Sequence, residues 1–143
     1  MGETTAEESW HRIVERVASK LAEALEVEAI IVFGSWARSG GGEWSDVDIL
    51  VISDNVEDID ILERFKLTAE YRSLGADIFV YTFKELANML EKGNPLAISA
   101  LVEGVPVRNS ERVKKLAEKA KKRYIRKRRV WIDLYRVKLD NST

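Results

Sequence analysis

The stretch Gly34 to Val51, GSWARSGGGEWSDVDILV, decides the fold. It connects one apolar run, Ile30–Phe33, to a second, Ile49–Val51. Short apolar runs rich in β-branched residues and bounded by glycine or polar residues are typical of buried strands. The stretch therefore predicts two strands joined by a glycine-rich connection, with the reactive residues at the strand ends.

Two carboxylates, Asp46 and Asp48, open the second apolar run. Residues two apart on a strand point to the same side, about 7 Å apart along the chain. Like charges on one face are costly unless cations lie between them. A site made of oxygen ligands alone favours Mg²⁺ or Mn²⁺ over zinc. The pair therefore predicts a divalent metal site.

A third carboxylate, Asp77, stands near the start of a later β-forming segment, residues 76–82. If this segment forms a strand beside the second one, Asp77 comes next to Asp46 and Asp48. The simpler alternative is an ordinary polar residue at the end of a strand.

The Gly34-Ser35 pair is a candidate anion site. Glycine lets a phosphate approach the backbone, and the serine hydroxyl adds a donor. A short helix beginning near Trp36 would aim backbone N–H groups at the same anion. Arg38, one turn further, is either a phosphate or substrate ligand or part of a surface ion pair. An isolated Gly-Ser pair is more simply a turn, so the downstream acids carry the functional interpretation.

The order of these motifs resembles the DNA polymerase β-like nucleotidyltransferase superfamily. The resemblance lies in Gly34-Ser35, the ten residues that follow, and Asp46-Val47-Asp48. The short chain and Ala37-Arg38 resemble its minimal nucleotidyltransferase (MNT) branch, over roughly residues 27–82.

The resemblance implies a reaction and a set of ligands. Two Mg²⁺ ions, or Mn²⁺, would be held by Asp46, Asp48 and Asp77. The triphosphate of ATP would be bound by Gly34, Ser35 and Arg38. The implied reaction moves a nucleoside monophosphate, AMP from ATP, onto a hydroxyl group, with Asp77 taking the proton.

The acceptor is expected on another protein, because the chain is too short to carry its own acceptor-binding domain. MNT proteins are commonly paired with small HEPN toxins, and the MNT antitoxin modifies a tyrosine of the toxin. Two alternatives remain open: an antitoxin that acts by contact with little catalysis, and an RNA-directed nucleotidyltransferase.

The net charge of −1 conceals an acidic body and a basic C-terminal part. Residues 1–109 hold ten Lys and Arg against twenty Asp and Glu, whereas residues 110–138 hold thirteen against three. The basic part is either a solvated helix or a surface for an acidic protein, a nucleic acid or a triphosphate. Its aromatic end, residues 131–137, suggests an interface, and homo-oligomers remain open.

Length and composition predict one soluble domain of 143 residues. The chain has no Cys and one His, which excludes disulfides, thiol catalysis and multi-His metal sites. It contains neither a signal-peptide pattern nor an apolar run of membrane-spanning length, so we expect a cytoplasmic protein that binds no membrane.

The expected fold class is α/β (α+β), a polymerase β-like core with a small mixed sheet, helices mainly on one face and the metal site on the other. The core would be residues 1–109, and residues 110–143 a long basic C-terminal helix of the same domain. A helix over about 58–73 is predicted to turn its apolar residues inward, namely Ile61, Leu62, Phe65 and Ala69, with Leu74 as a further candidate. Val105-Pro106-Val107 is predicted at a sheet edge because proline cannot donate to a strand ladder.

Overall fold

The computed structural model describes residues 6–35, 37 and 46–141 of the chain. Its centre is a four-stranded mixed sheet with the strand order β3-β2-β1-β4. The strands are β1 (Ala29–Phe33), β2 (Val47–Ile52), β3 (Ala76–Tyr81) and β4 (Val105–Arg108). β1 is antiparallel to both β2 and β4, whereas β2 and β3 are parallel. The predicted mixed sheet is confirmed, with β4 at one edge.

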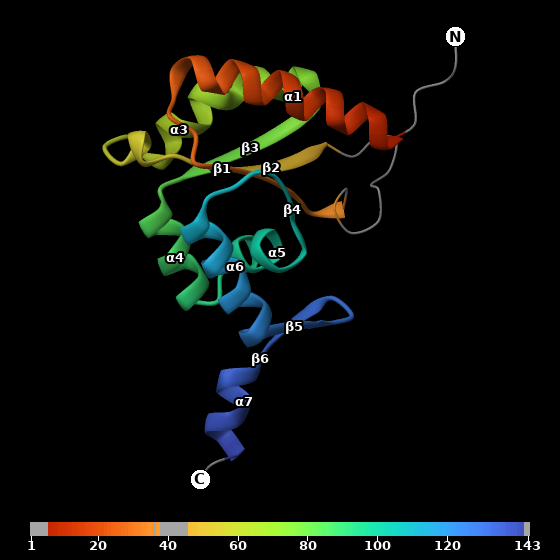
Figure 1. Ribbon diagram of the computed structural model, residues 1–143, viewed down its shortest axis with the longest axis vertical. Helices are drawn as coiled ribbons and strands as arrows, with labels where there is room; N and C mark the ends of the chain where they lie inside the picture. Colours follow the sequence, from red (N-terminus) through yellow and green to blue (C-terminus); the bar gives the residue numbers. More distant parts are fainter. Residues whose placement is uncertain (1–5, 36, 38–45, 142–143) are drawn as a thin grey trace.

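Helices cover both faces of this sheet (Figure 1). The helical elements are α1 (Ala6–Ala24), η1 (Asp54–Val56), α3 (Ile61–Thr68), η2 (Ala69–Leu74), α4 (Phe83–Glu91), α5 (Pro95–Glu103) and α6 (Glu111–Arg123). α1 and η2 pack on the face that holds Val47, Ile49 and Val51. α4, α5 and α6 pack on the face that holds Leu50 and Ile52.

The fold class is therefore confirmed, but the prediction of helices mainly on one face is wrong. All five residues of β1 are buried, and β2 buries apolar side chains on both of its sides. A sheet that is apolar on both faces needs a layer of helices on each. The face that carries Asp48 is consequently shared with the α4–α6 layer instead of being left open.

Local sequence signals set several helix ends. Thr82 and Glu85 form the two reciprocal hydrogen bonds of a capping box at the start of α4. Asn94 caps α5, whose first residue is Pro95. Gly75 ends η2 with a left-handed φ of 86°.

α3 buries a different side from the one predicted. Ile61, Leu62 and Phe65 are 36, 68 and 38% exposed, whereas Arg64 and Thr68 are buried. The Arg64 guanidinium donates to the backbone carbonyls of Val56, Ile59 and Val80 and to the Glu85 carboxylate. The spacing of apolar residues predicted the wrong buried side, because it carries no information about hydrogen-bond acceptors that distant segments supply.

The predicted long C-terminal helix is also wrong. α6 ends at Arg123 and is followed by a hairpin of β5 (Tyr124–Lys127) and β6 (Val130–Asp133), and then by α7 (Leu134–Asn141). The alternating sequence of the hairpin, rich in β-branched and aromatic residues, favours strands. Arg128 takes a φ of 60° in the two-residue turn. The Tyr124 hydroxyl donates to the carbonyl of Leu90 at 3.0 Å, which holds the hairpin against α4.

The first turn of α6 is tied to the sheet. Ser110 caps the helix and donates its hydroxyl to Glu28, and Arg112 forms two hydrogen bonds with the same carboxylate. Val113, Ala120 and Tyr124 are buried in the same core cluster as β1 and β2. Residues 110–124 therefore complete the core layer beneath the sheet.

Candidate active site

Three strand ends meet at one end of the sheet. β1 ends at Phe33 and is followed by Gly34. β2 is antiparallel to β1 and parallel to β3, so the starts of β2 and β3 lie beside the end of β1. Local sequence determines each strand, and the pairing brings their polar ends together.

The register places the second and third carboxylates side by side. Asp48 is opposite Asp77 across the parallel β2–β3 pair, and opposite Phe33 across the β1–β2 pair. Asp46 comes one residue before β2, two positions from Asp48, and is exposed. By strand alternation Asp46, Asp48 and Asp77 belong to the same side of the sheet.

Gly34 is fitted closely against Asp48. Its φ is 78°, and a Cβ added to it would collide with the Asp48 carboxylate oxygen Oδ2. Only glycine combines this backbone conformation with this approach at little cost. The turn after β1 thus brings the Gly34 backbone close to the Asp48 carboxylate. This arrangement suits a phosphate at the Gly34 backbone and a divalent cation between that phosphate and Asp48.

The Asp77 carboxylate is engaged by a cation of the protein itself. Arg72, from η2, lies with its Nε 3.5 Å from Asp77 Oδ1. In the part of the chain that the structure describes, no three acidic or histidine side chains are grouped as a ready-made metal cage. The donor chemistry still fits a hard divalent cation, since the carboxylates that the register brings to this end offer only oxygen.

A cluster of aromatic rings lies beside the carboxylates. The Phe33 and Phe79 rings pack at a centroid distance of 5.8 Å, and Phe65 of α3 meets Phe79 edge-on at 6.1 Å. Phe79 is two residues after Asp77 on β3 and shares its side of the sheet. These rings form an apolar cluster next to the strand positions of Asp48 and Asp77.

The structure brings the three predicted aspartates and Gly34 to one end of the sheet, and it adds Arg72 and the phenylalanines, which the sequence did not predict there. Phe33 directly precedes Gly34, which was an available signal, whereas the Arg72–Asp77 pair depends on how η2 packs on β3. Ser35 follows Gly34 at the same end of the sheet. Arg38, Trp36 and the glycine-rich connection lie outside the described residues.

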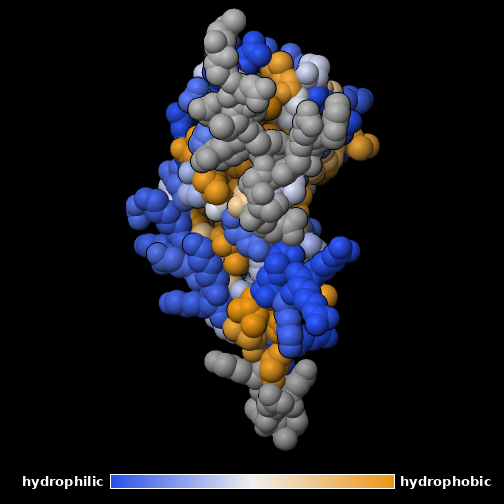
Figure 2. Space-filling view, turned by 90° about the vertical axis from the view of Figure 1, so that its right-hand side faces the viewer, coloured by the Kyte–Doolittle hydropathy of each residue, from blue (hydrophilic) through white to orange (hydrophobic). Residues whose placement is uncertain are grey.

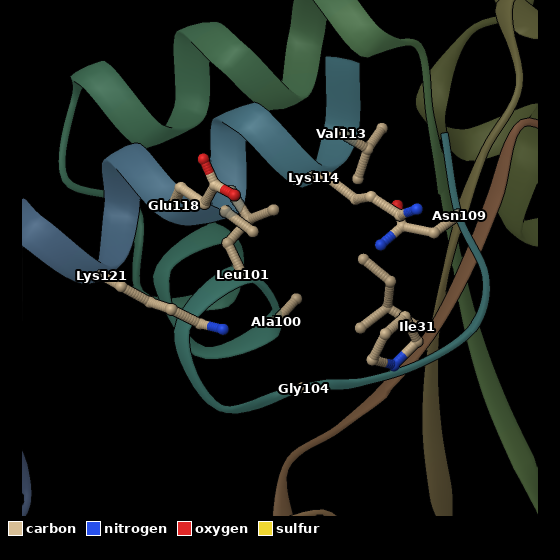
Figure 3. Close-up of a pocket in the computed structure, with 11 residues that line it drawn as sticks. Ile31, Ala100, Leu101, Gly104, Asn109, Val113, Lys114, Glu118 and Lys121 are labelled. Carbon is tan, nitrogen blue, oxygen red and sulfur yellow. The ribbon is translucent and has the colours of Figure 1, made fainter. Parts of the chain in front are cut away.

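A separate pocket of about 180 Å³ lies between α5, α6 and β4 (Figure 3). Ala100 and Leu101 face Ile31 across it, and Glu118 and Lys121 of α6 lie at its side (Figure 3). None of the candidate aspartates lines it, so the pocket and the candidate site are distinct.

The match with a family model defines the class of protein. The family model for the nucleotidyltransferase domain matches residues 12–132, and the chain belongs to this family. The match confirms the resemblance drawn from Gly34-Ser35 and the aspartates. A search of curated proteins gave no match.

Solved structures share the fold at low sequence identity. A candidate nucleotidyltransferase from Sulfolobus solfataricus is 19% identical, with 77% of this chain and 92% of that chain covered and a TM-score of 0.54. A chain of a toxin–antitoxin complex with AMP-PNP is 17% identical, with 74 and 82% covered and a TM-score of 0.53.

A third similar chain comes from a complex of a tri-AMPylated Shewanella oneidensis HEPN toxin with its MNT antitoxin. It is 14% identical, with 78% of this chain and 82% of that chain covered and a TM-score of 0.50. At these identities the likeness concerns the fold.

No helix among residues 6–35, 37 and 46–141 has both the length and the hydrophobicity needed to cross a bilayer.

Proposed function

We propose that this protein is a metal-dependent nucleotidyltransferase that transfers AMP from ATP to a tyrosine hydroxyl of a HEPN-type toxin. The observation that carries the proposal is the register of Asp48 against Asp77, with Gly34 closed onto Asp48. Family membership supports the transferase class, and the geometry supports carboxylate chemistry at this end of the sheet.

Asp46, Asp48 and Asp77 would hold two Mg²⁺ ions, with Mn²⁺ as the alternative. When bound, such ions neutralise triphosphate charge and lower the pKa of the acceptor hydroxyl. Gly34 and Ser35 would present backbone N–H groups and a hydroxyl to the phosphates, with Arg38 as a further phosphate ligand.

In the proposed step the acceptor oxygen bonds to the α-phosphorus of ATP. The bond from that phosphorus to the bridging oxygen breaks, and pyrophosphate leaves. The Asp77 carboxylate accepts the hydroxyl proton. Arg72 lies against this carboxylate, so it must share Asp77 with the cation or release it.

The choice of acceptor rests on the structural relatives. One is a chain of a complex whose HEPN toxin is AMPylated, and another comes from a toxin–antitoxin complex with an ATP analogue. A hydroxyl on a partner protein also suits a chain whose described part is filled by the sheet and its two helical layers.

The test combines the purified protein with Mg²⁺ and a HEPN-type toxin from the same organism. ATP carries the label on the α-phosphate in one sample and on the γ-phosphate in the other. We expect label on the toxin only from the α-phosphate, and its loss when the acceptor tyrosine becomes phenylalanine. Absence of α-label on the toxin would refute AMP transfer to this partner.

Variants assign the chemistry to the site. Asp48→Asn and Asp77→Asn should each reduce labelling by at least about 100-fold, because the proposal gives these carboxylates the binding of the metal ions and the acceptance of the hydroxyl proton. Asp58→Asn, an exposed acid outside the site, is the matched control and should retain native labelling.

An antitoxin that acts by contact is the second candidate, favoured by exposed apolar side chains on α3 and on the hairpin. Under that alternative Asp48→Asn would neutralise the toxin as well as the native protein does. Under the transferase proposal the same variant binds the toxin but leaves it active.

A further inference from the structure

The aromatic cluster beside the carboxylates reaches the protein surface beyond β3. In the strand order β3-β2-β1-β4, β3 is the strand at one edge of the sheet, and Phe65 of α3 packs edge-on against Phe79 of β3. Phe65 is 38% exposed, Phe79 is half-buried, and Phe33 is only 6% exposed. Phe65 is therefore the ring of this cluster that is most open to another molecule.

The cluster and the Asp77 carboxylate border the same small hollow. Its volume is about 30 Å³, and it is lined by Phe65, Thr68, Arg72, Asp77, Ile78 and Phe79. A hollow of this size has room for a water molecule but not for an aromatic ring, so a ring would lie over it. Phe79 is two residues beyond Asp77 on the same side of β3, about 7 Å along the strand. The hollow thus joins an aromatic surface to a carboxylate.

The order of the groups along this end of the sheet indicates which part of the substrates comes here. The argument rests on the proposed function, in which the phosphates of ATP are held at the turn after β1. From that turn outward lie Asp48 on β2, Asp77 on β3 and then Phe65 on α3. In phosphoryl transfer the attacking and leaving oxygens lie roughly in line on opposite sides of the phosphorus. A leaving group on the β1 side therefore places the acceptor on the β3 side, next to Phe65.

A phenol is the acceptor that fits this surface. Its ring can pack on Phe65 and Phe79 in the edge-to-face or offset arrangement that aromatic pairs prefer. Its hydroxyl can then reach Asp77, which the proposed step uses to accept the proton. A serine or threonine hydroxyl could reach the same carboxylate, but it would leave the aromatic surface uncovered.

The basic C-terminal part lies away from this surface. Figure 2 shows strongly hydrophilic side chains gathered over the lower part of the molecule, where Figure 1 places α6 and the hairpin, whereas α3 and β3 lie in the upper part. The exposed basic residues of the hairpin turn are Lys127, Arg128 and Arg129. Among the described residues that line the hollow, Arg72 alone is basic, and it lies beside Asp77. An uncharged aromatic side chain therefore suits this surface better than the phosphates of an RNA.

We infer that Phe65 and Phe79 form a subsite for the ring of an acceptor tyrosine, with the tyrosine hydroxyl at Asp77. The Phe79 ring is held between Phe33 and Phe65, whereas the Phe65 ring is open on its outer side. Phe65 is therefore the residue that determines specificity. The subsite selects a tyrosine over an aliphatic hydroxyl as the acceptor of AMP.

Binding of a small tyrosine probe tests the subsite without any transfer. The full chain, without metal or nucleotide, is titrated with N-acetyl-L-tyrosinamide and followed by NMR of its aromatic ring protons. We expect saturable shifts at Phe65 and Phe79, and at least about threefold weaker binding of N-acetyl-L-leucinamide, which has no ring. Unshifted Phe65 and Phe79 resonances up to the solubility limit of the tyrosine probe would overturn the inference.

Two variants separate the ring contact from the hydroxyl contact. Phe65→Leu keeps an apolar side chain without the ring, and should bind the tyrosine probe and N-acetyl-L-phenylalaninamide at least about threefold more weakly than the native chain. Asp77→Ala should weaken binding of the tyrosine probe alone, because the phenylalanine probe has no hydroxyl. Native affinity of Phe65→Leu for the tyrosine probe would contradict the subsite.

Matched controls separate this result from misfolding. Phe65→Tyr retains an aromatic ring and should bind both probes like the native chain. Leu62→Ala changes a residue of α3 that is 68% exposed and outside the aromatic cluster, and should also bind like the native chain. Equal weakening by Leu62→Ala and Phe65→Leu would show a general effect of α3 and would refute the role of the ring.

The labelling assay extends the test to the toxin. At toxin concentrations below saturation, Phe65→Leu should label the toxin at least about threefold more slowly through a higher KM, with unchanged affinity for a non-hydrolysable ATP analogue. A native labelling rate for Phe65→Leu would overturn the inference. If the native chain transfers no label, the proposed function fails, whereas the titration with the tyrosine probe still decides for or against the subsite.

Discussion

Asp48 and Asp77 occupy facing register positions on the parallel strands β2 and β3, although 28 residues separate them in the sequence. Neighbouring strands lie about 4.8 Å apart, so the two carboxylates are within reach of one cation. In the described structure Arg72 lies beside one of the pair, with its Nε 3.5 Å from Asp77 Oδ1. This relationship carries the metal-site proposal.

Magnesium should stabilise the native protein and not its Asp48→Asn variant. A ligand that binds only the folded state adds about 1.4 kcal/mol at ten times its dissociation constant. Without metal, Asp48→Asn should melt no lower than the native chain, because it removes one of two neighbouring like charges. Thermal melts with and without Mg²⁺ measure both effects. An equal Mg²⁺ response in the two proteins would count against this site.

Gly34→Ala should lower both stability and nucleotide binding. A left-handed φ costs a residue with a Cβ about 1–2 kcal/mol, and this Cβ also meets the Asp48 carboxylate. Gly75→Ala is the matched control: its φ is 86°, but its added Cβ would meet only Ile13 Cδ1, at 3.5 Å. Calorimetric titration with a non-hydrolysable ATP analogue should show weaker binding for Gly34→Ala alone. Equal losses of affinity in the two variants would contradict the role given to Gly34.

Arg64→Met should destabilise the fold by about 3 kcal/mol. It would leave three carbonyls and the Glu85 carboxylate without their charged donor, in a place where Arg64 is only 5% exposed. Lys66→Met, on the same helix at an exposed ion pair, should change stability by less than about 0.5 kcal/mol. Urea unfolding of both variants provides the comparison. A loss as small as that of Lys66→Met would show that these hydrogen bonds add little net stability.

Glu28 should make stability depend on pH in the acidic range. Its hydrogen bonds from Arg112 and then Ser110 outweigh burial and hold its pKa below the usual 4.5. A carboxylate whose folded pKa is depressed stabilises the fold above its unfolded pKa, and this contribution is lost as pH falls through the folded pKa. Stability should therefore decline below about pH 4.5.

Glu28→Gln should be less stable than the native chain near neutral pH, and the two melting temperatures should converge as the pH falls. Glu26→Gln, which changes an exposed neighbouring carboxylate, should follow the native curve. A constant gap between Glu28→Gln and the native protein at all pH values would contradict the assignment.

Strand positions and the candidate aspartates could be predicted from the sequence because their signals are local. The apolar run Ile30–Phe33 is followed by Gly34, and the apolar run Ile49–Val51 is preceded by Asp48. Each run lies within an observed strand. The capping box of α4 needs only Thr82 and Glu85. Strand alternation then places Asp46 and Asp48 on one side.

The orientation of α3 and the shape of the C-terminus could not be predicted in this way. Arg64 is buried because carbonyls from η1, the following loop and β3 surround it. The basic run after Arg123 has high helix propensity in part, but Tyr124 and Arg126 gain partners on Leu90 and Glu103 only if the helix stops. Tertiary contacts of this kind override local propensity.

By itself the sequence determined the mixed α/β fold and indicated the three aspartates and the glycine turn as the candidate site. Hydrophobic periodicity, β-branching and turn chemistry are signals that act within a few residues. Only the tertiary structure decided that Asp77 pairs with Asp48, that Arg72 lies against Asp77, and that α3 buries Arg64. These depend on strand order and on packing between segments far apart in the chain, which no local pattern encodes.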